Sequence, residues 1–187
     1  MDVTEWLWDR AERMDAAITR AMQRLWQVSH LLNATMVIVA KYTPIFMLVT
    51  LVIASTGWLP VEANAAKAPW NVASSICAAL LIRGIHEPIS RLVSRPRPFD
   101  TEPFQPLLRH DPGESFPSNH AAGGFALAMG AVHLPGYFPI LLCLAIVLAC
   151  SRTYCGLHHA TDVVIGSLGG IGTGLVVASF ARCLGFV

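Results

Sequence analysis

The chain has 187 residues, of which 54% are hydrophobic and only 13% are charged, and its formal net charge is +1. Soluble domains carry roughly 25% charged residues, so a water-soluble fold of this length would expose too much apolar surface, and a bilayer is the expected solvent. The near-neutral charge and the lack of a basic run give no indication of a nucleic-acid partner. The length fits a single domain over residues 1–187.

Five cysteines are too few and too scattered to predict a disulfide framework or a zinc site. Their number is odd, no CxxC pair occurs, and most lie in apolar runs, where cysteine packs as a small hydrophobe. They are Cys77, Cys143, Cys150, Cys155 and Cys183. No metal ligand set and no cofactor is therefore predicted.

The first element is an amphipathic helix over residues 2–27. Apolar residues recur there at steps of three and four, and acidic and arginine residues occupy the other face. Trp6, Trp8 and Trp26 suit a membrane interface. We expect residues 1–33 to form an interfacial helix that lies on the membrane or packs against a bundle.

Five apolar segments follow, and each is expected to be a transmembrane helix. Their approximate ranges are 34–59, 70–93, 119–134, 137–154 and 159–185. Residues 57–69 are predicted to form a loop. Residues 94–118 combine prolines with charged residues and are too irregular to lie in lipid, which makes them the predicted active-site loop. The fold class is thus all-α, an integral-membrane helical bundle with about five transmembrane helices plus an N-terminal amphipathic helix.

Ionisable residues in or beside membrane spans are costly, so they are candidates for function. His158 and Asp162 are four residues apart, and on a helix they would share a face on which their side chains can meet. A carboxylate on one ring nitrogen fixes the tautomer and leaves the other nitrogen free to attack or to accept a proton. Arg152 precedes them across the Gly156 turn and is close enough to hold an anion before that nitrogen.

Two earlier clusters carry complementary chemistry. The segment 117–120 (PSNH) opens an apolar helix, with Ser118 as a favourable N-cap, and the free N–H groups of such a helix start bind phosphate. His120 in the first turn is placed to protonate a leaving oxygen. Arg97, from the segment 95–98 (RPRP), would complete a cage of positive charge around a transferring group.

Together the three clusters resemble the motifs of the type 2 phosphatidic acid phosphatase (PAP2) superfamily, which are KxxxxxxRP, PSGH and SRxxxxxHxxxD. Residues 97–98 (RP) match the end of the first motif, and 117–120 match the second with Asn119 in place of glycine. Residues 151–162 (SRTYCGLHHATD) match the third at every fixed position. The motifs span residues 90–162, and the helix layout extends the resemblance over most of the chain.

The resemblance implies a role for each matched residue. His158 would attack phosphorus and form a phosphohistidine, Asp162 would orient and charge-stabilise it, and His120 would protonate the leaving group and later help to activate water. The phosphoryl oxygens would be held by four residues: Arg97, Ser118, Asn119 through its backbone, and Arg152. No metal or other cofactor takes part in this scheme.

The chain departs from the family pattern at Ser90, where the first motif has a lysine seven residues before Arg97. Either Arg91 or Arg95 supplies the missing charge, or that phosphate contact is absent. The change from glycine at Asn119 is milder, because a helix start accommodates asparagine well.

A site at the ends of spans, with little soluble domain around it, favours a lipid phosphate as substrate. Within the superfamily, the compact size and the segments 95–99 (RPRPF) and 115–120 (SFPSNH) most resemble bacterial undecaprenyl pyrophosphate phosphatases. That resemblance implies removal of the terminal phosphate from the C55 lipid diphosphate, which regenerates the carrier for cell-wall synthesis. Phosphatidylglycerophosphate, phosphatidic acid and lipid A phosphates stay open as substrates, as does phosphotransfer to another lipid. An inactive lipid-binding or transport homologue is the alternative of another class.

The expected partners are the lipid bilayer and a lipid phosphate substrate. If residues 94–118 and the turn at 155–158 share one face of the membrane, helix parity places the loops 57–69 and 134–136 on the opposite face. The resemblance further implies a multi-pass protein of the bacterial inner (plasma) membrane whose site faces the periplasm or the exterior. His86 and Glu87 either form a buried pair or line the entrance for the lipid.

Overall fold

The computed structural model describes residues 2–56, 67–109 and 113–187. These residues form helices only, and no strand occurs among them, as the fold class predicts. The helices are α1 (Val3–Trp26), α2 (His30–Thr56), α3 (Ala68–Val93), α4 (Pro98–Thr101), α5 (Asn119–Gly130), α6 (Phe138–Tyr154) and α7 (Ala160–Cys183). The predicted loop 57–69 lies mostly outside the described residues.

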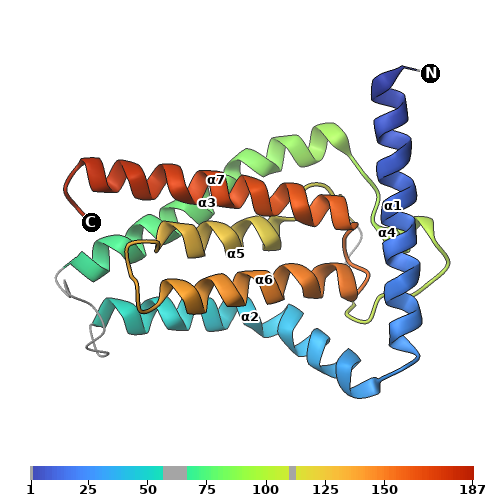
Figure 1. Cartoon of the computed structure of the whole chain (residues 1–187), viewed down its shortest axis with the longest axis horizontal. Coiled ribbons are helices and arrows are strands. Elements are labelled where there is room, and N and C mark those ends of the chain that lie inside the picture. Colours follow the sequence, from blue (N-terminus) through green and yellow to red (C-terminus); the bar gives the residue numbers. More distant parts are fainter. Residues whose placement is uncertain (1, 57–66, 110–112) are drawn as a thin grey trace.

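Helices α2, α3, α5, α6 and α7 run alongside one another as a bundle, and α1 lies across one end of it (Figure 1). The C-terminus and the connection from α5 to α6 lie at the other end. The central element is α5, since eight of its twelve residues are buried and it packs against α3, α6 and α7. The predicted all-α bundle is therefore confirmed, with α5 at its core.

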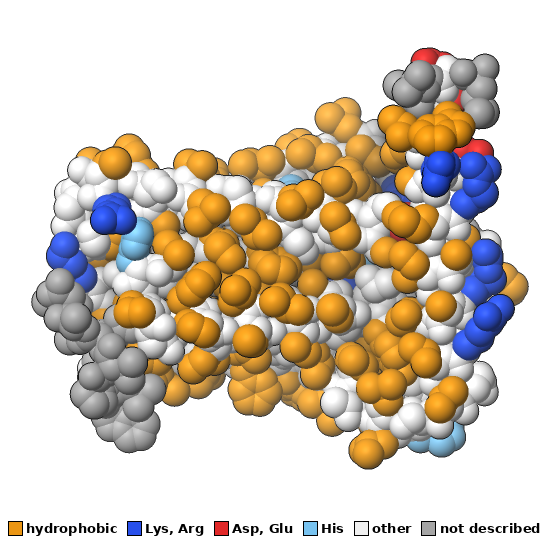
Figure 2. All heavy atoms as spheres, in the orientation of Figure 1, with side chains coloured by type: hydrophobic (Ala, Val, Ile, Leu, Met, Phe, Trp, Pro, Cys, Tyr) orange, Lys and Arg blue, Asp and Glu red, His pale blue; other side chains and the backbone are white. Residues whose placement is uncertain are grey.

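Within the described residues, three helices, α2, α3 and α7, are long and apolar enough to cross a membrane, and α6 is a shorter apolar helix of 17 residues. The predicted span at 119–134 is shorter than expected. At about 1.5 Å per residue, α5 rises about 18 Å, less than the roughly 30 Å of a hydrocarbon core, because it begins deep in the bundle. Figure 2 shows hydrophobic side chains over the side of the bundle and Lys and Arg gathered at its ends, as a bilayer requires.

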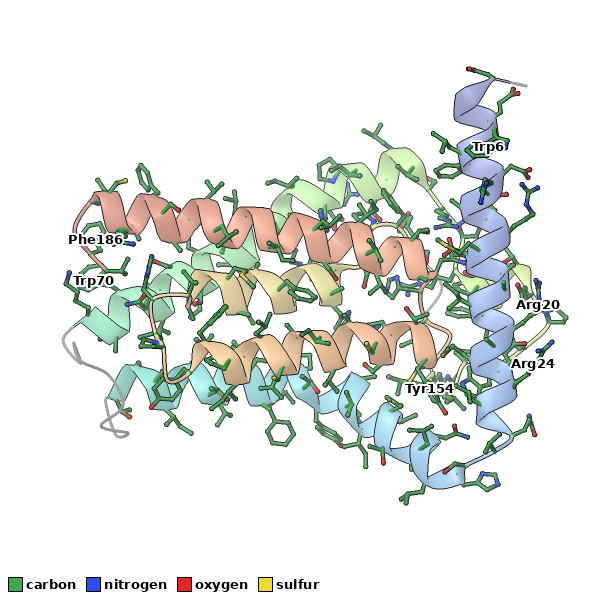
Figure 3. All side chains as sticks on the ribbon, in the orientation of Figure 1. Trp6, Arg20, Arg24, Trp70, Tyr154 and Phe186 are labelled. Carbon is green, nitrogen blue, oxygen red and sulfur yellow. The ribbon has the colours of Figure 1, made fainter. Side chains whose placement is uncertain are left out.

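Helix α1 packs on the bundle end instead of lying apart from it. The Trp26 indole N–H donates to the Tyr154 carbonyl oxygen over 2.8 Å, and the Trp26 ring meets Phe104 edge-on with ring centroids 5.7 Å apart. Figure 3 shows Arg20 and Arg24 on the side of α1 that faces away from the bundle. This arrangement buries one stripe of α1 and leaves its charged face at the aqueous end.

Glycines allow α7 to approach α5 closely. A Cβ atom at Gly166 would lie 2.6 Å from the carbonyl oxygen of Ser118, and one at Gly170 would collide with the carbonyl oxygen of Ala122. Small residues are typical of such contacts in membrane helices, where van der Waals packing drives association. The contact at Gly166 holds the start of α5 against α7, which positions the residues around Ser118.

We expect Gly170→Ala to destabilise the protein, because the added methyl group meets backbone that has no room to move. Overpacking of this kind costs about 1–3 kcal/mol. The matched control is Gly172→Ala on the same helix, where a Cβ atom would meet nothing within 4 Å. Thermal unfolding in detergent should show a lower midpoint for Gly170→Ala only; equal midpoints for the two variants would contradict the close approach of α5 and α7.

Candidate active site

The three sequence clusters meet at the end of the bundle that α1 covers. Backbone hydrogen bonds tie them together: Ser118 N–H donates to the Asp162 carbonyl oxygen over 3.1 Å, and Ser115 N–H donates to the Arg95 carbonyl oxygen over 2.7 Å. The turn after α6 joins the same assembly, because Leu107 N–H donates to the carbonyl oxygen of Cys155 over 3.1 Å. Segments distant in sequence thus form one site.

His158 lies in the turn between α6 and α7 and is only 3% exposed. Its Nδ1 atom is 2.7 Å from the carbonyl oxygen of Ser115. A carbonyl oxygen can only accept, so Nδ1 carries the proton and the lone pair is on Nε2. Nε2 lies 3.2 Å from Nη1 of Arg97. The nitrogen that is free to react therefore faces a guanidinium group.

The predicted contact between Asp162 and His158 is corrected by the structure. His158 precedes α7, which begins at Ala160, so the helical spacing used in the sequence argument does not apply. Asp162 instead accepts hydrogen bonds from the Ser115 hydroxyl group over 2.5 Å and from the His159 backbone N–H over 3.0 Å. Ser115, which sequence reasoning missed as a site residue, therefore links the carboxylate to the imidazole.

Arg95 stands between two buried carboxylates. Its Nη1 lies 2.5 Å from Asp162 Oδ1, and its Nη2 lies 2.8 Å from Asp15 Oδ2. Asp15, on α1, also accepts hydrogen bonds from the backbone N–H of Thr161 over 3.0 Å and from its hydroxyl over 2.5 Å. Sequence reasoning missed Asp15. Its side chain is only 1% exposed, and this burial, which indicates a structural role, is visible only in the folded structure.

Each arginine considered as a substitute for the motif lysine is paired with carboxylates instead. Arg95 forms ion pairs with the carboxylates of Asp15 and Asp162. Arg91 pairs with Glu87 over 2.7 Å on an exposed face of α3. Glu87 consequently forms no pair with His86, which is buried and lines a groove between α3 and α7.

Arg152 is 2% exposed, and its Nε and Nη2 atoms are buried without a hydrogen-bond partner in the described part of the chain. Buried unpaired donors are costly, more so when they are charged. Arg97, by contrast, is fixed by carbonyl oxygens, since Nη1 donates to Leu157 over 2.8 Å and Nε donates to Gly113 over 3.2 Å. Two guanidinium groups thus converge beside His158, and the unpaired nitrogens of Arg152 fit an anion.

Burial and the neighbouring charges both favour the neutral form of His158. Burial lowers the pKa of His158 well below its ordinary value, and the charges of Arg97 and Arg152 lower it further, while the hydrogen bond to Ser115 opposes them. His120 also lowers that pKa, which places its ring near the site. A neutral imidazole at neutral pH keeps the Nε2 lone pair available for attack.

The start of α5 supplies the remaining predicted residues. Ser118 is fully buried and caps α5, with its hydroxyl accepting from the N–H of Ala121 over 3.5 Å. Asn119 and His120 form the first turn and line a cavity of about 160 Å³. The structure therefore brings together all seven predicted site residues, and the free N–H groups of this helix start add to the positive potential.

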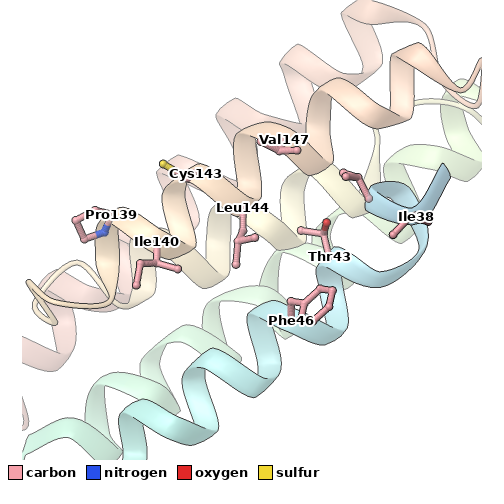
Figure 4. Close-up of a pocket in the computed structure, with 9 residues that line it drawn as sticks. Ile38, Thr43, Phe46, Pro139, Ile140, Cys143, Leu144 and Val147 are labelled. Atoms are coloured by element: carbon pink, nitrogen blue, oxygen red, sulfur yellow. The ribbon is translucent and has the colours of Figure 1, made fainter. Parts of the chain in front are cut away.

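Two apolar grooves open on the sides of the bundle. One, of about 530 Å³, lies between α2 and α6 and is lined by residues such as Phe46 and Leu144 (Figure 4). The other, of about 670 Å³, lies between α3 and α7 and reaches Phe116 and Pro117, immediately before Ser118. An apolar chain in this second groove would end beside the site.

Fold and site together define a multi-pass membrane protein in which a buried histidine lies beside two arginines, one of them with buried nitrogens that lack a partner among the described residues. The model of the PAP2 superfamily matches residues 68–183, which is more than half of the chain. The protein therefore belongs to the PAP2 superfamily.

Its relatives act on lipid phosphates, to judge by their names. The chain is 34% identical over 103 residues to a lipid A 1-phosphatase of Rhizobium johnstonii, covering 51% of this chain and 42% of the relative. It is 35% identical over 85 residues, covering 44% and 43%, to YbjG of Escherichia coli K12, which is provisionally named an undecaprenyl-diphosphatase. The chain thus matches less than half the length of these curated relatives.

Solved structures show the same fold. LpxE of Aquifex aeolicus superposes with a TM-score of 0.66 at 24% identity, covering 81% of this chain and 87% of the other. A PAP2-type phosphatidylglycerolphosphate phosphatase of Bacillus subtilis superposes with a TM-score of 0.64 at 23% identity, covering 93% and 85%. At these identities the likeness concerns the fold alone.

Proposed function

We propose that this protein is a membrane lipid phosphatase that hydrolyses undecaprenyl diphosphate to undecaprenyl phosphate and phosphate through a phosphohistidine intermediate. The observation that carries the proposal is the pair of buried, unpaired nitrogens of Arg152 beside Arg97 and the Nε2 atom of His158. Such a position fits a phosphoryl group within reach of a nucleophile.

In the first step Nε2 of His158 attacks the terminal phosphorus. The N–P bond forms, the P–O bond to the leaving group breaks, and His120 donates a proton to the departing oxygen. Arg97, Arg152 and the N–H groups at the start of α5 hold the equatorial oxygens, where charge accumulates in the transition state. In the second step His120 takes a proton from water, which attacks phosphorus and releases His158.

Asp162 acts on the nucleophile through Ser115. Its carboxylate fixes the Ser115 hydroxyl group, and the Ser115 carbonyl oxygen holds Nδ1–H of His158. Attack through Nε2 leaves a positive charge on the imidazole, which the nearby carboxylate stabilises. Arg95 holds that carboxylate in place.

A lipid substrate is supported by the two apolar grooves on the sides of the bundle. The groove between α3 and α7 leads to the segment before Ser118. The groove between α2 and α6 is lined by Thr43, Phe46 and Val147, the chain neighbours of residues that line the cavity at Asn119 and His120. The resemblance to undecaprenyl pyrophosphate phosphatases supports a bacterial inner-membrane location with the site facing the periplasm or the exterior. Lipid A 1-phosphate is the second candidate substrate, favoured by the Rhizobium relative.

The purified protein in detergent with EDTA is expected to release phosphate from undecaprenyl diphosphate faster than from lipid A, phosphatidylglycerophosphate or phosphatidic acid. Colorimetric phosphate assays at matched surface concentration measure the preference, and mass spectrometry of the lipid products separates hydrolysis from transfer to a second lipid. A preference for a monoester would support the phosphatase activity but contradict undecaprenyl diphosphate as the substrate. Release from none of the four lipids would favour an inactive lipid-binding homologue.

A further inference from the structure

Arg83 is a charged residue of helix α3 that lies well before the C-terminal end of that helix. Val93, the last residue of that helix, lies ten residues on, which is about 15 Å at 1.5 Å per residue and further than an arginine side chain reaches. No ion pair or hydrogen bond engages Arg83 within the described residues. An arginine at this depth is costly and normally marks a functional site.

Arg83 lines a cavity of about 160 Å³. Its polar lining consists of Arg83, Asn119 and His120. The other lining residues are apolar or glycine, namely Pro44, Met47, Gly123, Gly124, Leu127 and Leu148. One liquid water occupies roughly 30 Å³, so the cavity admits a group of several heavy atoms. A cation and the proposed general acid thus face the same small space.

Arg83 also shares a face of α3 with the position where the family motif has lysine. Ser90 lies seven residues further on, which is close to two full turns of helix. The positive charge that Ser90 lacks is therefore present two turns nearer the middle of α3, on the exposed side chain of Arg83. If the terminal phosphate is held near His158, Arg83 is placed to meet the next group of the substrate on the side of His120.

We propose that Arg83 binds the phosphate that stays on the lipid when the substrate is a diphosphate. The proposal rests on the proposed function and names its specificity determinant. When the bond from His158 Nε2 to the terminal phosphorus forms, the bond from that phosphorus to the bridging oxygen breaks. The oxygen keeps the electron pair and takes a proton from His120, so the leaving group is a lipid monophosphate beside His120.

Charge makes this contact selective. A lipid monophosphate leaving group is anionic, and it gains a guanidinium partner in the cavity. The leaving group of a monoester is a neutral alcohol, which offers Arg83 no charge to neutralise. The residue therefore favours diphosphate substrates over monoesters with the same chain.

The test uses the full-length protein with farnesyl diphosphate and farnesyl phosphate, which share one chain. Arg83→Ala is expected to lower kcat/KM for the diphosphate by about tenfold to a hundredfold and to change the value for the monophosphate by less than about threefold. Arg83→Lys should retain most of the preference. The control is Arg91→Ala, which removes an exposed arginine of the same helix that is paired with Glu87.

An unchanged ratio of the two kcat/KM values in Arg83→Ala would overturn this inference while leaving the phosphatase activity in place. Equal losses on both substrates, with Arg83→Lys also inactive, would overturn it as well and would assign Arg83 to folding or general phosphate binding. Weaker inhibition of Arg83→Ala by farnesyl phosphate, with inhibition by inorganic phosphate unchanged, would support it independently of turnover. A wild-type protein inactive on every lipid would instead sink the proposed function.

Discussion

His158→Ala is expected to lower phosphate release by about 10³-fold or more, the largest effect of any single substitution. The variant lacks the Nε2 atom that lies beside Arg97, and losing the nucleophile removes the covalent route altogether. Turnover with a radiolabelled terminal phosphate should also leave an acid-labile, base-stable label on the wild-type protein and none on the variant.

His159→Ala provides the matched control for that experiment. The neighbouring side chain is half-buried, and the His159 backbone N–H donates to Asp162 over 3.0 Å, so the alanine variant keeps this hydrogen bond. We expect it to retain most of its activity and its label. Release from His158→Ala at the wild-type rate, or a label that persists there and vanishes in His159→Ala, would refute the assignment of the nucleophile.

Asp162→Asn is expected to lower kcat by roughly 10²-fold or more. Its carboxylate is fully buried and accepts from Ser115, Arg95 and the His159 backbone. The amide cannot accept at both positions or stabilise the charged imidazole that forms on attack. Breaking one partner of a buried ion pair also costs about 3–5 kcal/mol of stability, which should appear as a lower unfolding midpoint.

Asp15→Asn separates the two effects, because Asp15 binds the other side of the same arginine. This variant also breaks a buried ion pair and should lose a similar amount of stability, yet it leaves the link from Asp162 through Ser115 to His158 intact. The kcat value and the unfolding midpoint of both variants, measured in the same detergent, test the distinction. Equal losses of kcat would mean that Asp162 serves only to hold Arg95.

The network around Arg95 gives α1 a role beyond membrane contact. Asp15 on α1 holds Arg95 and Thr161, and Arg95 holds the carboxylate that fixes Ser115. The interfacial helix is therefore attached to the residues that orient His158. An amphipathic helix with no contact to the site would need no buried aspartate on its inner face.

The sequence by itself determined the helices and most of the site. Apolar residues at steps of three and four predicted a helix at 2–27, and an apolar run after Pro135 and Gly136 predicted one at 137–154. The structure has Val3–Trp26 and Phe138–Tyr154. These features are local, since periodicity and breakers act within a few residues. The spacing of the third motif likewise identified His158 and Arg152, because residue types that suit one reaction recur at fixed intervals.

Only the tertiary structure decided which groups meet. Arg95 pairs with Asp15 and Asp162, 80 and 67 residues away, and no local pattern indicates such partners. The start of α7 at Ala160 left His158 outside the helix, so Ser115 holds its ring in place of Asp162. Arg83 came to share a cavity with His120 because α3 packs on α5. Chain packing sets the neighbours of a buried charge, and those neighbours decide what it does.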